Sequence, residues 1–464
     1  MNPFNVCNLK GKIDMTPSMK RRSFMKTAAA ASTAVAVPTI IPASALGKDG
    51  RPAPSERMTL GCIGNGNNGM NWMRNFLSDD RVQVVAVCDV NKYSKGYWAD
   101  REGGRDVARA EVNKRYKNQS LTEKDCYPDF RELLARKDID AVQIATPDHW
   151  HALHVIHAAR AGKHIYGQKP LSLTIREGRM MSDAVKKAGV TFQTGSQQRS
   201  SIHFRKGIEL VRNGFIGKVH TIKVGLPGGH PDYNKHGREK EETPVPEGLD
   251  YNLWLGPAPE AFYCPARLHV NWRWNLDYSG GQVTDWGAHH IDIAQWAMKN
   301  QKTGPVSFTN LKGHFPPRSE LYNTADRYDW ECTYKDGLKL LVGTGQKGGV
   351  TFEGEDGKWI YTNRGRLQSN PGDIVKSKID DSMERVYVSN DHVRNFVDCV
   401  FSGKEPIAPI EDAHRTITVA HLGNIALQLG RETLNWNPDK EVVVDDAAAN
   451  KLLSRPYRAP WKLA

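Results

Sequence analysis

The sequence predicts an α/β fold, in which an N-terminal doubly wound parallel sheet is followed by an α+β domain with a large, mainly antiparallel open sheet. Three observations support this prediction. Residues 60–89 read as strand, glycine turn, helix and second strand; apolar runs alternate with helical patterns as far as residue 194; and from residue 219 β-rich runs follow one another with few helices between them. Alternating strands and helices are typical of parallel sheets, and successive strands are typical of antiparallel sheets.

The first strand, Met58 to Ile63, leads directly into the sequence GNGNNG. Its glycines have the G-x-G-x-x-G spacing: the first permits a tight turn, the second lets backbone N–H groups approach a pyrophosphate, and the third lets the helix pack closely on the sheet. The phosphates would lie at the positive end of that helix. The flanking strands therefore favour a Rossmann dinucleotide site over a flexible loop. The expected cofactor contacts in this turn are Gly64, Gly66, Asn67, Asn68 and Gly69.

An acidic residue follows the second strand, Val82 to Cys88. Asp89 comes 20 residues after Gly69, the spacing at which a carboxylate reaches the ribose hydroxyls of adenosine. Because an acid there repels a 2′-phosphate, NAD is the expected cofactor and NADP is less favoured. The alternative is a strand-end acid that only starts a turn with Asn91.

Further strand and helix patterns define two domains after residue 57. Residues 58–195 form the predicted NAD-binding domain, with later strands at 141–144, 163–166 and 190–194 and helices at 150–161 and 175–188. Thr174 is the expected N-cap of the second helix. Residues 196–464 form the predicted substrate and oligomerisation domain, with strands at 219–226, 306–311, 330–335 and 338–343 and helices at 393–401 and 413–429. Between the strands predicted at 219–226 and 306–311, residues 227–260 are rich in Gly, Pro and charge and read as a long functional or partly disordered loop.

Composition excludes several classes of protein. The formal net charge is +12, but much of the excess lies in the first 45 residues and no long Lys/Arg run occurs elsewhere, so no nucleic-acid partner is expected. The cysteines form no C-x-x-C pair, which argues against a zinc site or a disulfide framework. Histidines cluster at 149–157 and 289–290, but without an H-E-x-x-H pattern no metal is expected.

The N-terminus looks like an export signal. Residues 1–45 contain KRRSFMK at 20–26, an alanine-rich stretch and ASA at 43–45, as in a twin-arginine signal peptide, and Met19 is an alternative start. The apolar stretch is short and contains prolines, so no stable membrane anchor is expected. Residues 46–57 read as an extended arm. A periplasmic or otherwise exported location implies tightly held NAD, because no free nicotinamide pool exists outside.

Two segments that follow parallel strands should meet at the carboxyl edge of the sheet, where open α/β folds bind ligands. They are Thr146-Pro147-Asp148 and Gln168-Lys169-Pro170. Further along, Asp285 and His289 are at positions i and i+4 of a helix predicted over 285–298, close enough for the carboxylate to orient the imidazole. That pair suits a general base.

Together these segments resemble the Gfo/Idh/MocA family, named after glucose–fructose oxidoreductase and inositol dehydrogenase. The resemblance runs from about Met58 to the helix near Ala413, and it rests on four motifs in order. They are the glycine turn, the stretch from Thr146 to His151, AGKHIYGQKP at 161–170, and GG-x-x-x-D-x-G-x-H at 280–289. Two positions depart from the usual family pattern: Gln168 replaces a glutamate and Asp148 replaces an asparagine.

The resemblance implies that Lys169, Asp285 and His289 line the site where a sugar or polyol carbon meets the nicotinamide. His289 is then expected to take the hydroxyl proton, Asp285 to orient it and Lys169 to stabilise the negative charge. Further cofactor contacts are expected from Thr146, Pro147, His151, Gln168 and Lys169. Expected substrate contacts are Gln197, Arg199, Trp272, Arg273 and His290, with a structural ion pair as the alternative for Arg199 and core packing for Trp272.

The predicted function is therefore hydride transfer between tightly held NAD and a sugar, glycoside or polyol, with a second carbonyl compound taking the hydride back. A redox-neutral, NAD-dependent glycosidase or lyase is one alternative, although such relatives lack the lysine-proline motif found at 169 and 170. A non-catalytic sugar-binding protein is another, and the retention of Lys169, Asp285 and His289 argues against it. The open face of the antiparallel sheet predicts a homodimer or homotetramer.

Overall fold

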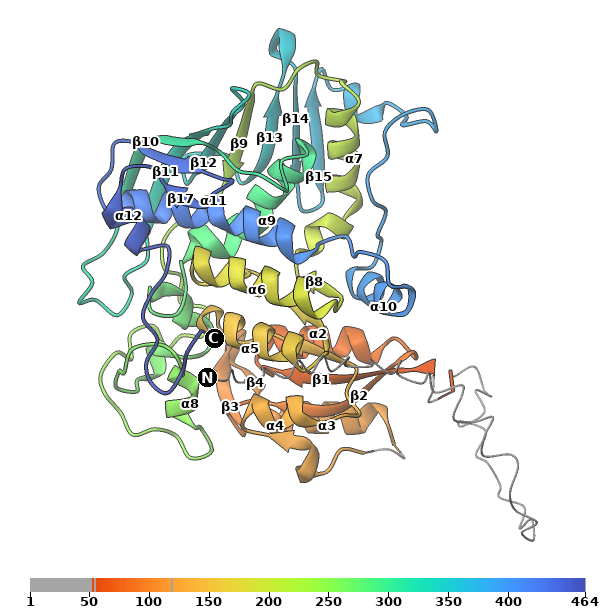
Figure 1. Cartoon of the computed structure of the whole chain (residues 1–464), viewed down its shortest axis with the longest axis vertical. Helices are drawn as coiled ribbons and strands as arrows, with labels where there is room; N and C mark the ends of the chain where they lie inside the picture. The colour runs from red at the N-terminus through yellow and green to blue at the C-terminus, as the bar shows by residue number, and fades with distance from the viewer. Residues whose placement is uncertain (1–51, 54–55, 118–119, 464) are drawn as a thin grey trace, which may run out of the picture. The chain divides into compact units, whose positions relative to one another are not determined.

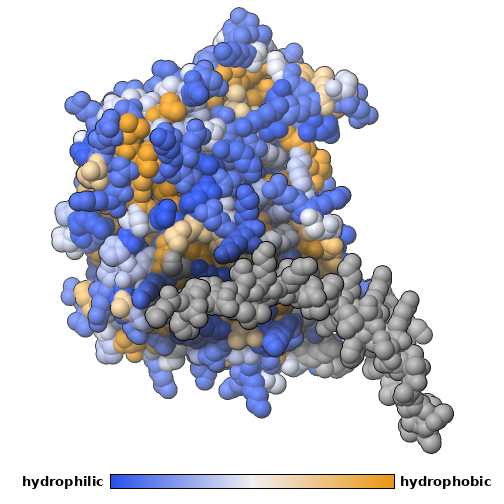
Figure 2. Space-filling view, in the orientation of Figure 1, coloured by the Kyte–Doolittle hydropathy of each residue, from blue (hydrophilic) through white to orange (hydrophobic). Residues whose placement is uncertain are grey.

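The computed structural model describes residues 52–53, 56–117 and 120–463, and those from Glu56 onward belong to one compact unit. The predicted export peptide at 1–45 and most of the arm at 46–57 lie outside the described residues. Among the residues that are described, no helix has the length and apolar character needed to cross a membrane. Hydrophilic residues dominate the face shown in Figure 2, where apolar residues form small separate patches.

The first sheet has six parallel strands, as the sequence predicts (Figure 1). In spatial order they are β5 (Cys126–Tyr127), β2 (Val82–Cys88), β1 (Met58–Ile63), β6 (Ala141–Ile144), β7 (His164–Gly167) and β8 (Phe192–Thr194). Ile63 at the end of β1 pairs with Cys88 of β2 and Ile144 of β6. The loops that follow these three strands therefore begin at the same edge. A separate short hairpin, β3 (Ser94–Tyr97) and β4 (Arg101–Gly103), lies after β2.

Helices cover both faces of this sheet because the side chains of its strands alternate between two cores. The helices α2 (Asn67–Leu77), α3 (Arg105–Arg115) and α10 (His392–Ser402) pack on one face, and α4 (Phe130–Ala135) and α5 (Asp148–Arg160) pack on the other. In β1, Leu60 and Cys62 face the first group, whereas Gly61 faces Leu133 of α4. The helix α6 (Ile175–Ala188) starts at the predicted Thr174, which forms a capping box with Glu177.

The glycine turn shows why two of its residues lack side chains. Gly64 has a φ of +84°, in the left-handed region that glycine adopts without strain. A Cβ atom on Gly69 would lie 1.9 Å from the carbonyl oxygen of Gly64, so the first turn of α2 packs directly against the loop after β1. The predicted close approach of helix and sheet at Gly69 is confirmed.

Replacing Gly69 with alanine should therefore lower the free energy of unfolding by about 1–3 kcal/mol, because backbone must shift to admit the methyl group. Gly372→Ala is the matched control, since a Cβ atom there meets nothing within 4 Å. Urea unfolding of both variants measures the difference. Equal midpoints for the two variants would contradict the close packing.

The second sheet has nine strands and is mostly antiparallel (Figure 1). In spatial order they are β15 (Arg366–Asn370), β14 (Trp359–Asn363), β13 (Gly349–Glu353), β9 (Thr221–Gly225), β12 (Lys339–Gly343), β11 (Arg327–Thr333), β10 (Ser307–His314), β16 (Leu434–Asn437) and β17 (Val442–Val443). One neighbouring pair, β9 and β12, is parallel. The chain can form that pair because it crosses over between them through two α-helices and two further strands.

One face of the second sheet is covered by α7 (Ile202–Arg212), α9 (Gln282–Ala297) and α11 (Ile410–Gln428). Burial alternates along β11, where Tyr328, Trp330 and Cys332 point into the core. Two short helices complete the fold, α8 (Tyr251–Leu255) and α12 (Ala447–Lys451). The helix α9 begins three residues before its predicted start, after Gly281 with a φ of +72°.

A single apolar core joins the two sheets. It contains Ile144 and Ile165 of the first sheet, Ile222 and Val342 of the second, and Ile417 of α11. The helix α11 packs on both α6 and α9, which bridges the two halves of the chain. This shared core therefore fixes the position of α9 relative to the loops at the edge of the first sheet.

Candidate active site

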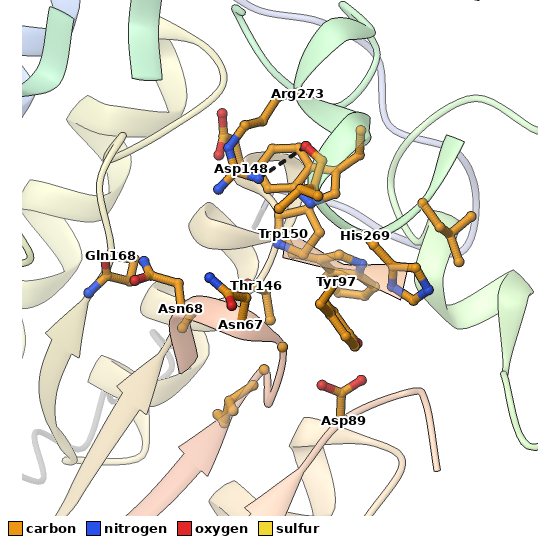
Figure 3. Close-up of a pocket in the computed structure, with 18 of the residues that line it drawn as sticks. Asn67, Asn68, Asp89, Tyr97, Thr146, Asp148, Trp150, Gln168, His269 and Arg273 are labelled. Carbon is orange, nitrogen blue, oxygen red and sulfur yellow. Dashed lines mark hydrogen bonds between the residues drawn. The ribbon is translucent and has the colours of Figure 1, made fainter. Parts of the chain in front are cut away.

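One cavity of about 350 Å³ lies at the carboxyl edge of the first sheet and extends to α9. Its lining includes the predicted cofactor contacts Gly64, Gly66, Asn67, Asn68, Asp89, Thr146, Pro147 and Gln168. It also includes the predicted catalytic and substrate residues Lys169, Asp285, His289, Gln197, Trp272 and Arg273. In Figure 3, Arg273 and Asp148 lie together at one end of the pocket and Asp89 lies at the other. Segments that are far apart in the sequence thus share one cavity.

The turn after β1 has the features of a dinucleotide cradle. The helix α2 starts at Asn67 without a side-chain cap, so its first backbone N–H groups are open to a ligand. Beside it, the Asn68 side chain donates to Oε1 of Gln168 at 2.8 Å. The Nε2 atom of Gln168 is buried, and no hydrogen-bond partner for it is found among the residues that the structure describes. A buried donor that lines a cavity and has no partner fits a bound polar group such as the nucleotide.

Asp89 ends β2 and closes the other end of the cavity. Its two carboxyl oxygens accept backbone N–H groups from Asn65 at 2.6 Å and Asn91 at 2.9 Å. Burial raises the pKa of Asp89, and these two hydrogen bonds offset only part of the increase. Both hydrogen bonds hold the carboxyl group against the glycine turn, where the adenosine ribose of a dinucleotide would lie.

Lys169 and Asp285 form a direct ion pair at the opposite end. The Lys169 ammonium donates to Oδ1 of Asp285 at 2.6 Å and to the Asp285 carbonyl oxygen at 3.1 Å. The Arg273 guanidinium lies 3.5 Å from the same Oδ1 atom. Burial alone would raise the pKa of Asp285, but the two cations outweigh it and hold that pKa below its usual value. Asp285 is therefore a carboxylate at neutral pH.

His289 does not form the expected bond to Asp285. Its Nδ1 atom is buried without a hydrogen-bond partner, and the Asp285 carboxylate is instead occupied by Lys169 and Arg273. Burial, and then the nearby Lys169 charge, hold the pKa of His289 well below its usual value. The imidazole is thus neutral and able to accept a proton.

Asp148 is a further acidic residue of this cavity, and the sequence indicates it only as part of the loop after β6 and as a departure from the family pattern. It is the first residue of α5, it is 2% exposed, and Ser279 Oγ donates to its Oδ2 at 2.7 Å. Burial raises the pKa of Asp148 to about 7, despite the Ser279 hydroxyl and the Arg273 charge. Two acids in one cavity thus have pKa values that are shifted in opposite directions, a pattern common in active sites.

The raised pKa of Asp148 predicts a pH-dependent stability. Its folded-state pKa of about 7 exceeds the ordinary value of 3.8, so the protein loses stability as the pH rises between these values and the full loss is present above 7. Above that pH, Asp148→Asn should be more stable than wild type by up to about 4 kcal/mol, and in acid the difference should disappear. Chemical unfolding at several pH values measures it. A difference that does not change with pH would contradict the shift.

Family models cover nearly all of the described chain. Residues 58–196 match the NAD-binding Rossmann fold of the Gfo/Idh/MocA oxidoreductase family, and residues 201–463 match its C-terminal alpha/beta domain. The chain belongs to the Gfo/Idh/MocA family. The resemblance inferred from the four motifs is thereby confirmed.

Individual members of the Gfo/Idh/MocA family are more distant. Myo-inositol 2-dehydrogenase of Thermotoga maritima is 27% identical over 52% of this chain and 55% of its own length. Alpha-N-acetylgalactosaminidase of Shewanella oneidensis is 29% identical over 44% of each chain. The WlbA dehydrogenase of Bordetella pertussis, solved with NADH and UDP-GlcNAcA, has a TM-score of 0.58 at 16% identity and covers 82% of this chain and 99% of its own. The chain spans about half the length of the curated relatives it matches.

This Gfo/Idh/MocA chain does not place all the predicted site residues in its cavity. His151 is buried beside it, with its ring nitrogens 2.8 Å from the carbonyl oxygens of Thr146 and Pro170, so it joins the two loops and does not face the cofactor. Arg199 is 2% exposed and bonds Asp292 and Asp412, which makes the structural ion pair correct and substrate binding wrong.

His290 and Gly69 also lie outside the lining of the cavity. The Nδ1 atom of His290 is 2.9 Å from the carbonyl oxygen of Gly225, and its ring is buried under β9, so the predicted substrate contact is wrong. Gly69 acts through the packing of α2 on Gly64 and makes no direct contact with the cavity. In both cases the preceding residue on the same helix lines the cavity: His289 before His290, and Asn68 before Gly69.

The long loop predicted over 227–260, extended to residue 275, forms one wall of the cavity. We call residues 227–275 the cover segment. It bonds the stretch after β2 through the backbone: Lys92 donates to Gly248 at 2.9 Å, and Ala99 donates to Tyr233 at 3.1 Å. The ring of Tyr97 stacks at a tilt on that of His269, with centroids 4.3 Å apart, next to Gly66. Sequence patterns gave no signal for these contacts, since they join segments more than 100 residues apart.

The clustered histidines of this family member have separate partners. His149 lies 3.0 Å from the Trp254 carbonyl oxygen, and His154 lies 3.1 Å from the Thr146 hydroxyl. In residues 52–53, 56–117 and 120–463, no group of three or more His, Cys, Asp or Glu side chains is arranged to hold a metal ion.

Proposed function

We propose that this protein is an NAD-dependent oxidoreductase that transfers a hydride between a tightly held cofactor and a sugar, glycoside or polyol. The observation that supports it most is the single cavity, because it joins the glycine turn and Asp89 at one end to Lys169, Asp285 and His289 at the other. A dinucleotide bound there would have its adenosine at Asp89 and its nicotinamide at the ion pair. Myo-inositol dehydrogenase among the relatives supports a polyhydroxylated substrate.

The residues have separate tasks in this proposal. NAD, when bound, would supply the hydride acceptor, C4 of its nicotinamide ring. The neutral imidazole of His289 takes the proton of the reacting hydroxyl, and the Lys169 ammonium stabilises the negative charge that develops on that oxygen. Asp285 fixes the Lys169 ammonium through the 2.6 Å ion pair, so its role is to position the lysine, not the histidine.

A redox-neutral cleavage of glycosides is the second candidate. It is favoured by the Shewanella oneidensis alpha-N-acetylgalactosaminidase, which belongs to the matched relatives. In such a reaction the hydride returns to the sugar after the bond is broken, so no net reduction of the cofactor accumulates. The proposed oxidoreductase and this alternative therefore differ in their products.

The test begins with the cofactor. Native protein is denatured and the released nucleotide is identified by chromatography. NAD or NADH close to one per chain is expected. If the protein releases no nucleotide and binds none when it is added, the proposal is overturned. Asp89 supports NAD over NADP, so added NADP should bind more weakly. Incubation with a panel of aldoses, glycosides and inositols then separates the two reactions. Stable absorbance of reduced nicotinamide supports the oxidoreductase, and bond cleavage without it supports the glycosidase.

Export through the twin-arginine pathway is part of the same proposal, because that route carries proteins that fold and take up cofactor before they cross the membrane. Lys-Arg-Arg at 20–22 supports it. Changing Arg21 and Arg22 to lysine should retain the protein in the cytoplasm, which cell fractionation measures. A homo-oligomer that covers the open face of the second sheet is also proposed, and light scattering gives its mass.

A further inference from the structure

Asp148 is a buried acid for which the proposed mechanism has no task. Its Oδ2 atom accepts the Ser279 hydroxyl, and Ser279 Oγ in turn accepts the Gly281 backbone N–H at 3.3 Å. The other carboxyl oxygen, Oδ1, has no hydrogen-bond partner within the described part of the chain, and Asp148 lines the cavity. A polar atom at a cavity wall that has no partner among the described residues calls for a ligand or a water molecule.

The charged groups around Asp148 come from three other elements. Lys169 follows β7, Arg273 lies in the 3-10 helix His269–Trp274, and Asp285 lies on α9. The two cations bond or approach Asp285, and neither forms an ion pair with Asp148 in the described structure. On its own helix, burial keeps the neighbouring His149 neutral by lowering its pKa to about 3. Asp148 thus lacks the direct cation contact that keeps Asp285 ionised.

This arrangement decides where a proton on Asp148 would sit. The Ser279 hydroxyl donates its hydrogen to Oδ2, and while that hydrogen bond is in place a proton on Asp148 cannot lie on Oδ2. A protonated Asp148 must therefore carry its hydrogen on Oδ1, which has no protein acceptor. The O–H bond would then be available to a ligand in the cavity.

We propose that Asp148 is a substrate-binding residue that acts as a neutral carboxylic acid, donating a hydrogen bond from Oδ1 to an acceptor oxygen of the bound sugar. Such an oxygen carries no hydrogen of its own, as in a keto, ring or glycosidic oxygen. The inference rests on the proposed function, since it takes the cavity ligand to be a sugar or polyol. It assigns Asp148 to recognition, separate from the proton transfer at His289.

The raised pKa of Asp148 agrees with its proposed role as a hydrogen-bond donor to the sugar. With a pKa of about 7, Asp148 keeps its proton below neutral pH and loses it above neutral pH. A carboxylate would repel the acceptor oxygen that the acid binds. Binding of the sugar should therefore weaken about tenfold for each pH unit above 7, while the chemical step at His289 is less affected.

Three variants test the proposal through KM, kcat and their pH dependence. Asp148→Asn places an amide donor at the same position, so its KM should match that of the wild type in acid and lack the rise in base. Asp148→Ala should raise KM at every pH. Ser279→Ala removes a hydrogen bond that lowers the pKa of Asp148, so the rise in KM should move to higher pH. If the KM of Asp148→Asn rose with pH as much as that of the wild type, the proposal would be overturned.

Two further measurements do not depend on turnover. The infrared difference between wild type and Asp148→Asn should contain a protonated-carboxyl C=O band that disappears near pH 7. Sugar binding, with myo-inositol and methyl glucoside as probes, is followed through the fluorescence of Trp272 and Trp286, which line the cavity. If no sugar reduces the cofactor, the proposed function fails, but these readouts still decide the protonation of Asp148. A carboxylate band from Asp148 in solutions well below pH 7 would refute it.

Discussion

Lys169→Met is expected to lower kcat/KM by about 10²–10⁴-fold, because it removes the one ammonium group that the structure places on Asp285 in the cavity. Without that cation, the pKa of Asp285 should rise, since burial would then act against one positive neighbour in place of two. The measurement is steady-state kinetics with a sugar from the panel, together with the amount of nucleotide that remains bound. We expect the nucleotide content to stay near that of the wild type.

Lys163→Met is the matched control for this variant. Lys163 lies just before the same strand, at its other end, where its ammonium donates to the carbonyl oxygens of Arg136 and Ile139 at 2.7 and 2.8 Å. Its removal should reduce stability but leave turnover per folded molecule unchanged. If both variants lost activity equally, the loss at Lys169 would reflect damage to the strand and not a missing charge.

Arg199→Leu should lower the free energy of unfolding by about 3–5 kcal/mol, because it leaves two acids without their main partner in the core. The guanidinium bonds Asp292 at 2.6 Å and Asp412 at 2.9 Å, and all three side chains are nearly inaccessible. Burial already raises the pKa of Asp292, and loss of the arginine raises it further. The destabilisation should therefore be greater in base than in acid, which denaturant titration at two pH values measures.

An exposed ion pair gives the comparison. Arg318 lies 3.8 Å from Asp277, with 65% of its side chain accessible, and Arg318→Leu should change stability by about 1 kcal/mol or less. A similarly small effect at Arg199 would show that its acids find other partners. Lys302, which lies 2.7 Å from Asp412, is the candidate for such compensation.

The parts of the site that could be predicted from sequence are those set by local geometry. The glycine turn, the acid at the end of β2 and the loops after β6 and β7 each follow from a strand whose end is visible in the pattern. Parallel strands then bring these loops to one edge without further information. For the same reason the cofactor end of the cavity agrees with the prediction at Gly64, Gly66 and Asp89.

The partner of each side chain was harder to predict, because it depends on packing across the two domains. Helical spacing places Asp285 and His289 on one face, but it does not show that Lys169, more than 100 residues earlier, occupies the carboxylate. Spacing also cannot say which of His289 and His290 faces the cavity, and only the former does.

Polarity explains one strand that is missing from the predicted second sheet, and a charged turn separates two others. The sequence RLQSN of β15 has one apolar residue, and β13 and β14 are separated by the charged turn Glu355–Gly357. These strands form because β9 and α7 offer a template and a cover, which the local sequence does not show. The docking of α10 on the first sheet, through Phe396 against Phe76, has the same origin.

The apolar core that runs through both sheets has a consequence for motion. Because α6, α9 and α11 are packed into one continuous interior, hinge bending between the halves would break that interior, so the halves should melt together in one cooperative transition. Traffic into and out of the cavity must then depend on local opening of the cover segment, in which residues 227–250 form no helix or strand. Hydrogen exchange should accordingly be fast at residues 230–250 and slow in β1 and α11.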